Sequence, residues 1–180
     1  MSKQILVSGF GGQGILSLGK ILAKAAIVED KNATWFPSYG AEVRGGTAHC
    51  FVKISKESIA SPFVEYPDIG IILNQPSLDK YRKQFKKGCF LILNSDFISR
   101  DSVNKGIKKI SLPLNKMALD CGSLKVANII ALGILVLFYP GIIKKDSVIK
   151  VLKETYRDKE ILKQNLDALG KAKSLDIKIQ

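Results

Sequence analysis

Apolar residues follow two kinds of strand pattern along this chain. Continuous apolar runs occupy residues 69–73, IGIIL, and residues 89–93, CFLIL. Strands that are buried on both faces of a parallel sheet have such runs. Residues 47–55, TAHCFVKIS, alternate with a period of two, which predicts a half-exposed or edge strand. Three further short strands are predicted, at residues 3–9, 33–36 and 107–113.

Helical periodicity separates these strands. Residues 13–28 carry apolar side chains at helical spacing, and residues 76–85 begin with a proline suited to a first helical turn. Two amphipathic helices are predicted after residue 141, over residues 146–156 and 158–169. The order of elements predicts an α/β fold: a Rossmann-like, open, mostly parallel sheet with helices on both faces. No repeat or linker divides the chain, so we expect a single domain over residues 1–180.

A helix over residues 124–138, LKVANIIALGILVLF, is apolar almost all round. Such a helix must be covered on every side. It either forms a subunit interface or lies at the centre of the domain. Gly133 in its middle costs about 1 kcal/mol relative to alanine unless it permits a close backbone approach.

Charge and cysteine content exclude few classes of protein. The net charge is +12, but no Arg-rich or aromatic-interleaved basic run predicts nucleic-acid binding. The three cysteines are far apart and form no Cys-x-x-Cys, so we expect no iron–sulfur or zinc site, and buried thiols at Cys50 and Cys89. We expect no secretory signal or membrane span, and therefore a soluble cytoplasmic protein.

The segment SGFGGQG at residues 8–14 contains the spacing Gly-x-Gly-x-x-Gly between a predicted strand and a predicted helix. Glycines let a ligand approach the backbone, and a helix start favours phosphate. Alternatively, Gly11 and Gly14 only permit tight helix–strand packing. Nicotinamide binding would require an acid after the second strand, whereas Glu29 and Asp30 precede it, as expected for solvated turn residues.

A second segment, SYGAEVRGG at residues 38–46, combines a tyrosine, an acid and an arginine with three glycines. Arg44 could bind a carboxylate or phosphate with Glu42 orienting it. Alternatively, Glu42 and Arg44 pair with each other within a turn. The density of glycines favours a site or an interface.

Together, GFGGQG at residues 9–14 and SYGAEVRGG resemble the gamma subunit, or gamma domain, of the 2-oxoacid:ferredoxin oxidoreductases. The resemblance continues through SPFVEYPDIGIILNQPSLDKY at residues 61–81 and weakens after about residue 140. The second segment is more similar to the 2-oxoglutarate type than to the pyruvate type. Ala41 stands where many members have proline.

The resemblance implies a non-catalytic subunit of an enzyme that converts a 2-oxoacid, coenzyme A and oxidised ferredoxin to acyl-CoA, carbon dioxide and reduced ferredoxin. Thiamine diphosphate, magnesium and iron–sulfur clusters are implied in alpha, beta and ferredoxin-like delta subunits, because this chain has no Gly-Asp-Gly motif and no cluster-binding cysteines. His49, the single histidine, is expected to be structural or exposed. The isolated chain could form a homodimer.

The resemblance also implies site residues. A candidate phosphate site for coenzyme A comprises Gly9, Gly11, Gly12, Gln13 and Gly14. The loop facing the catalytic subunits comprises Ser38, Tyr39, Gly40, Glu42, Arg44, Gly45 and Gly46, with Asn74 and Gln75 on the same side of the sheet. No catalytic or metal-binding residue is expected. The competing hypotheses are a free-standing nucleotide- or flavin-binding Rossmann-type protein and a basic nucleic-acid-binding module.

Overall fold

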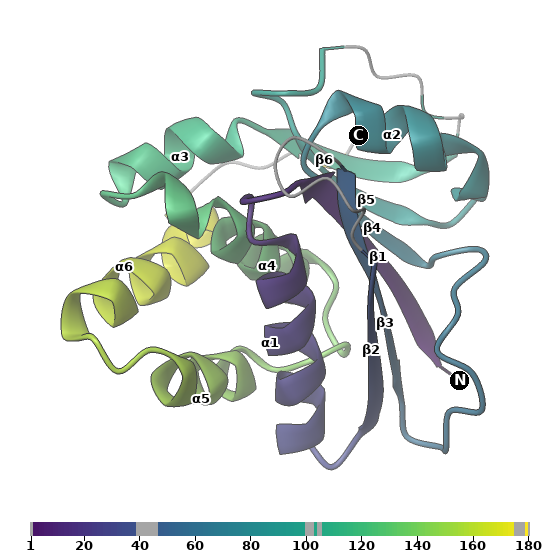
Figure 1. The fold of residues 1–180 in the computed structure, drawn as a ribbon, viewed down its shortest axis with the longest axis horizontal. Coiled ribbons are helices and arrows are strands. Elements are labelled where there is room, and N and C mark those ends of the chain that lie inside the picture. The colour runs from purple at the N-terminus through teal and green to yellow at the C-terminus, as the bar shows by residue number, and fades with distance from the viewer. Residues whose placement is uncertain (1, 39–46, 100–102, 104–105, 175–178, 180) are drawn as a thin grey trace.

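The computed structural model of the chain describes residues 2–38, 47–99, 103, 106–174 and 179. Its six strands form one sheet in the order β2-β3-β1-β4-β5-β6 (Figure 1). Four of these strands are parallel: β1 (Lys3–Phe10), β4 (Ile69–Ile72), β5 (Phe90–Asn94) and β6 (Lys108–Leu112). The predicted open, mostly parallel α/β sheet is therefore confirmed.

The other two strands give the sheet a mixed edge. β3 (Thr47–Ser55) lies between β1 and β2 (Asn32–Ser38) and is antiparallel to both. Its burial alternates, as the period of two predicts, but β3 is not an edge strand because β2 pairs with its outer side. β2 includes Pro37 within the strand at the edge of the sheet, where the missing N–H of proline is tolerated.

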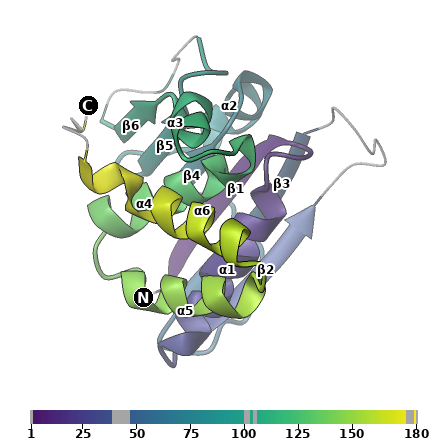
Figure 2. The same cartoon turned by 90° about the vertical axis from the view of Figure 1, so that its left-hand side faces the viewer.

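Helices cover the two faces unequally. One face carries α1 (Ile15–Val28), α3 (Leu114–Asp120) and α4 (Ala127–Phe138). Figure 2 shows α5 (Lys145–Thr155) and α6 (Lys159–Gly170) as an outer layer over α1 and α4. The opposite face carries α2 (Gln75–Tyr81). Three short 3₁₀ segments complete the helices: Arg82–Gln84, Leu124–Val126 and Lys171–Ser174.

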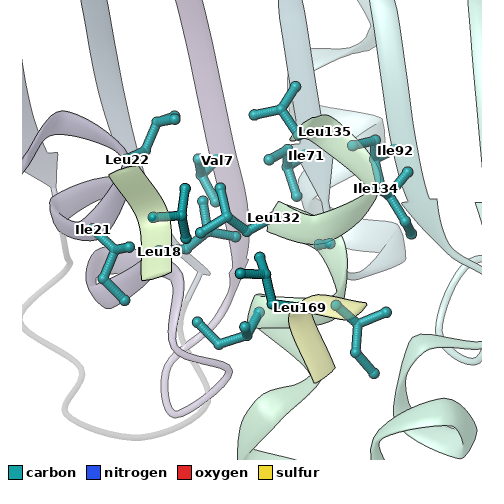
Figure 3. Close-up of a cluster of buried hydrophobic side chains, with 14 of the residues drawn as sticks. Val7, Leu18, Ile21, Leu22, Ile71, Ile92, Leu132, Ile134, Leu135 and Leu169 are labelled. Atoms are coloured by element: carbon teal, nitrogen blue, oxygen red, sulfur yellow. The ribbon is translucent and has the colours of Figure 1, made fainter. Parts of the chain in front are cut away.

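The main hydrophobic core lies between the sheet and the helices of the larger layer. Figure 3 shows side chains from β1, β4 and β5 meeting those of α1, α4 and α6. The continuous apolar runs are buried on both faces, as predicted, because Ile71 faces this core and Ile72 faces a second, smaller core under α2. Cys50 and Cys89 are buried, which confirms the predicted core thiols.

α4 is the central helix of the domain. All nine residues from Ala127 to Leu135 are buried, and the helix packs against α1, α3 and α6. The central-helix interpretation of residues 124–138 is therefore confirmed, and the subunit-interface alternative is wrong for this buried stretch. A Cβ added at Gly133 would lie 2.5 Å from the carbonyl oxygen of Leu169, so the glycine permits a close approach of α4 and α6.

The turn between α1 and β2 corrects one expectation. Glu29 is not a solvated turn residue: its carboxylate accepts hydrogen bonds from the backbone N–H of Lys144 (2.5 Å) and from Nζ of Lys31 (2.9 Å). Asp30 is exposed, as expected, with a positive φ of 56°. The α1–β2 turn is thus joined to the start of α5.

Candidate functional site

The carboxyl ends of β1, β4, β5 and β6 meet at one edge of the sheet because these strands are parallel. The glycine segment lies at this edge, between β1 and α1. Open α/β sheets bind ligands at the carboxyl ends of their strands. The topology therefore places the first predicted segment where a ligand site is expected.

The glycines of this segment serve two different purposes. Gly9 is buried in β1, and a Cβ there would lie 2.5 Å from Oε1 of Gln13. Gly14 has a φ of +72°, and a Cβ there would lie 2.4 Å from Nδ2 of Asn128. Gly11 and Gly12 are exposed, and no atom lies within 4 Å of a Cβ built on either. Gly9 and Gly14 therefore permit close packing, whereas Gly11 and Gly12 border open space.

Two amide side chains fix the loop. Oε1 of Gln13 accepts the N–H of Phe10 at 2.6 Å, and Nε2 of Gln13 donates to the carbonyl of Leu73 at 3.4 Å. Nδ2 of Asn128 donates to the carbonyl of Gly14 at 3.0 Å. The loop is therefore tied to the residue that follows β4 and to α4.

The start of α1 is available to an anion. Its N-cap residue is Gly14, which has no side chain to cap the helix. The first turn of α1 also contains no acidic residue. The first N–H groups of a helix have no partner within the helix and carry a partial positive charge. A phosphate placed beside Gly11 and Gly12 would meet these groups.

A cavity of about 140 Å³ opens beside the loop. It is lined by Gly12, Gln13, Leu73, Asn115, Leu124, Lys125 and Ala127. Ligand pockets for whole small molecules are usually about 300–1,000 Å³, so this cavity suits a phosphate group rather than a complete cofactor. The exposed Lys125 adds a positive charge at its rim.

Sequence reasoning missed Asn115 and Lys125. Both follow β6, at the edge of the sheet where the glycine loop lies. Oδ1 of Asn115 accepts from Nδ2 of Asn94 at 2.9 Å, and the N–H of Asn115 donates to Asp96 at 2.7 Å. The predicted strand β6 could have indicated this region, because the chain leaves every parallel strand of the sheet at the same carboxyl edge.

Asn74 has a structural partner. Its Oδ1 accepts the N–H of Ser77 at 2.8 Å and so caps α2. The residue has no exposed surface, and its Nδ2 has no hydrogen-bond partner. Contact between Asn74 and a ligand therefore stays a prediction. The neighbouring Gln75 is partly exposed at the start of α2.

The second predicted segment is described only at its first residue. Ser38 ends β2, opposite His49 of β3. Tyr39, Gly40, Glu42, Arg44, Gly45 and Gly46 lie outside the described residues. His49 is half-buried against the rings of Phe51 and Tyr81, and burial, together with nearby Lys80, lowers its pKa, so the imidazole is neutral at pH 7.

Within the described ranges, no group of three or more His, Cys, Asp or Glu residues could hold a metal ion. Among the same residues, no helix has the length and apolar character needed to cross a membrane. The described residues at the glycine loop offer backbone N–H groups, amide side chains and the ammonium of Lys125.

Comparison with known proteins identifies the chain. The family model described as pyruvate ferredoxin/flavodoxin oxidoreductase matches residues 4–175. The chain belongs to this family. The match covers nearly the whole chain and includes both segments that carry the resemblance. It sets aside a free-standing nucleotide- or flavin-binding protein.

Relatives within the family have different substrates in their names. The chain is 38% identical over 158 residues to 2-oxoglutarate synthase subunit KorC of Methanocaldococcus jannaschii, which covers 86% of this chain and 84% of the relative. It is 35% identical over 167 residues to ketoisovalerate oxidoreductase subunit VorA of Methanothermobacter thermautotrophicus. That match covers 92% of this chain but only 35% of the relative, so this chain spans about a third of VorA.

Solved structures confirm the fold. The gamma subunit of a keto/oxoacid ferredoxin oxidoreductase from Geobacter sulfurreducens is 30% identical with a TM-score of 0.83, over 95% of this chain and 94% of that chain. The 2-oxoglutarate:ferredoxin oxidoreductase of Magnetococcus marinus, with 2-oxoglutarate, coenzyme A and succinyl-CoA bound, is 25% identical with a TM-score of 0.87. There the match covers 96% of this chain and 30% of that chain. This family member therefore has the fold of a gamma subunit.

Proposed function

We propose that the chain is the gamma subunit of a thiamine diphosphate-dependent 2-oxoglutarate:ferredoxin oxidoreductase. The observation that carries the proposal is the match to KorC, which extends over most of both chains. The reaction joins 2-oxoglutarate and coenzyme A to give succinyl-CoA and carbon dioxide, and two electrons pass to ferredoxin. Thiamine diphosphate, magnesium and the iron–sulfur clusters belong to alpha, beta and ferredoxin-like delta subunits in this proposal.

The role of this chain is to hold the phosphate end of coenzyme A. The N–H groups at the start of α1, the open side of Gly11 and Gly12, and Lys125 would bind the anion. Gln13 and Asn128 hold the loop in position. The segment of residues 38–46 would face the catalytic subunits and complete their site, with Arg44 supplying a second positive charge.

One preparation tests both the assembly of the complex and the identity of its 2-oxoacid substrate. The tagged chain is isolated anaerobically from its native host, and viologen reduction is assayed with coenzyme A and 2-oxoglutarate, 2-oxoisovalerate or pyruvate. We expect thiamine-containing subunits to co-purify and 2-oxoglutarate to be the best substrate. Recovery of the chain alone would refute the gamma-subunit role, and preference for 2-oxoisovalerate would refute the proposed substrate.

The coenzyme A site is tested by kinetics of the assembled enzyme. Lys125→Ala and Arg44→Ala should each raise the KM for coenzyme A about tenfold, because a lost charge-assisted contact is worth about 1.5–3 kcal/mol. Lys24→Ala, an exposed position in the middle of α1, is the matched control. An unchanged KM in both site variants would show that the phosphate binds elsewhere.

A further inference from the structure

Three hollows surround the turn that follows α4, and two of them reach the amino ends of the parallel strands. All three are lined by residues of the turn Tyr139–Ile142. This is the end of the sheet opposite the glycine loop, because β1, β5 and β6 begin here. We call the residues that line the three hollows the amino-end surface.

Each hollow combines an apolar floor with lysines. The first, of about 390 Å³, has Lys144, Lys145 and Lys173 around a floor that includes Leu137 and Leu169. The second, of about 540 Å³, has Lys3 and Lys108 around Phe90, Phe138 and Tyr139. The third, of about 250 Å³, has Lys3, Lys31 and Lys56 beside Ile54 and Ile142. No acid is among the described residues that line them.

Two of these lysines do not favour the helix that carries them. Lys144 is the N-cap residue of α5 and makes no side-chain cap hydrogen bond, and Lys145 is the first helical residue. A helix N-terminus carries partial positive charge, so cations there oppose helix stability. Ser, Thr, Asp or Asn would stabilise the N-cap position better. The charge at these positions is therefore suited to an external partner rather than to α5.

Residues just outside each end of the family match line the second hollow. Lys3 at the start of β1 and Ile179 line it together. In VorA the domain makes up about a third of one polypeptide. The 167 matched residues correspond to 92% of this chain, so the match runs along the domain with few gaps. The remaining polypeptide of that relative therefore continues beyond one or both ends of the domain, and Lys3 and Ile179, near these ends, line the amino-end surface.

We propose that the amino-end surface is a docking site for a neighbouring subunit. This subunit corresponds to the polypeptide that is fused to the domain in the longer relatives, and the face that docks carries acidic and apolar side chains. This inference rests on the proposed function, since it assumes that the chain works within a complex. Carboxylates of the partner would pair with Lys108, Lys144 and Lys173, whereas Lys31 is already paired with Glu29. Apolar side chains of the partner would enter the hollows. In the longer relatives, the fused polypeptide would begin beside this surface.

The chemistry of the surface favours a protein over a polynucleotide. Its cations are all lysines, whereas arginine is the residue best suited to bidentate recognition of phosphate. The floors of the hollows consist of aliphatic and aromatic side chains. A phosphate backbone would leave these apolar side chains exposed to water. Three separate hollows around one turn also exceed what a single small anion would occupy.

The test uses the complex isolated with the tagged chain under anaerobic conditions. A carbodiimide, which joins lysine amines directly to carboxylates, is added before mass spectrometry. We expect links from Lys108, Lys144 or Lys173 to acidic residues of one neighbouring subunit. The double variant Lys108→Glu/Lys173→Glu should reduce retention of the chain in the complex at least about tenfold, because attraction becomes like-charge repulsion. Lys24→Glu/Lys163→Glu, at exposed helix positions outside the hollows, makes the same change in net charge and should be retained.

A third variant separates docking from folding. Lys145→Gln removes a cation from the first turn of α5, so the thermal midpoint of the isolated chain should be unchanged or higher while retention falls. Normal retention of all variants in an intact complex would overturn the inference and leave the proposed function standing. Nuclease-sensitive retention would overturn it in favour of a polynucleotide. A wild-type chain that purifies alone would overturn the proposed function and this inference together.

Discussion

Glu29 and Lys144 are 115 residues apart, and the carboxylate of the first accepts the backbone N–H of the second at 2.5 Å. Lys144 provides no side-chain cap for α5, so the Glu29 carboxylate supplies an acceptor where the N-terminal N–H groups need one. Lys31 completes the junction by donating from Nζ to Glu29 and to the carbonyl of Ile142 at 2.7 Å. One carboxylate therefore joins α1 to the outer helical layer.

Stability should depend on the charge of Glu29. Burial alone would raise its pKa, but the N–H of Lys144, the ammonium of Lys31 and the hydroxyl of Ser147 outweigh burial and lower it. The unfolded carboxyl, with a pKa of about 4.3, then binds protons more readily than the folded one. The contribution of Glu29 is therefore fully present above about pH 4.3 and is lost as the pH falls through the lower folded pKa.

Glu29→Gln tests this dependence. The variant should be less stable by about 1.5–3 kcal/mol at pH 7, the usual size of a hydrogen bond to a charged group. Denaturant unfolding at several pH values should show the difference from wild type shrinking as the solution becomes acidic. Asp30→Asn, at an exposed position, is the control. A difference in the free energy of unfolding that does not change with pH would mean that the charge of Glu29 does not contribute to stability.

Gly133→Ala should destabilise the chain. The added methyl would lie 2.5 Å from the carbonyl oxygen of Leu169, so α4 and α6 must move apart. Overpacking of this kind usually costs about 1–3 kcal/mol, which exceeds the gain in helix propensity of about 1 kcal/mol. Thermal unfolding should show a lower midpoint. Gly11→Ala, where no atom lies within 4 Å of the new methyl, should leave the midpoint nearly unchanged.

Two buried asparagines should respond differently to replacement by leucine. Oδ1 of Asn94 accepts the N–H groups of Asp96 and Leu114, and its Nδ2 donates to Asn115. Loss of these partners should cost about 2–4 kcal/mol, since each orphaned buried group costs about 1–3 kcal/mol. Denaturant unfolding of the variant measures this loss.

Asn128 is the contrasting position. Its Oδ1 is buried without a partner, and the Gly14 carbonyl that its Nδ2 binds also accepts the N–H of Leu18. Asn128→Leu should therefore change the free energy of unfolding by less than about 1 kcal/mol, because the helix bond keeps Gly14 satisfied. A loss equal to that of Asn94→Leu would show that the polar contact of Asn128 with the glycine loop stabilises the fold.

The cysteines should differ in reactivity. Burial raises the pKa of the Cys50 and Cys89 thiols to about 12, so almost no thiolate forms at pH 8. Cys121 is only partly buried. Iodoacetamide should label Cys121 first in the native chain and all three thiols in denaturant, and Cys121→Ser should abolish the early labelling. Rapid native labelling of Cys50 would contradict its burial.

The sequence predicted those parts of the fold that depend on local periodicity. β4 and β5 were visible as apolar runs because strands buried on both faces need them. α3 was missed because it is short and because its start is satisfied from far away. Oδ2 of Asp96 accepts the N–H groups of Asn115 and Lys116, and no local pattern reveals an acceptor so distant in sequence.

Long-range pairing explains the other differences. The alternation of residues 47–55 identifies a half-exposed strand but cannot say whether β2 will cover its edge. Glu29 was expected in solvent because its partner at Lys144 belongs to another layer. At the candidate site, the glycine spacing located the loop, whereas the place of Lys125 depended on how the 3₁₀ segment Leu124–Val126 packs beside Gln13 and Leu73.

The sheet order also determines how the molecule opens. β1 and β4 have hydrogen-bonded neighbours on both sides and cores on both faces, whereas β2 has one neighbour and no fully buried residue. Amide hydrogens of β1 and β4 should therefore exchange with solvent last, and those of β2 early. The glycine loop begins on β1, one of the two strands expected to exchange last. A bound anion would thus be held by the most persistent part of the protein, and its escape would not require the sheet to unfold.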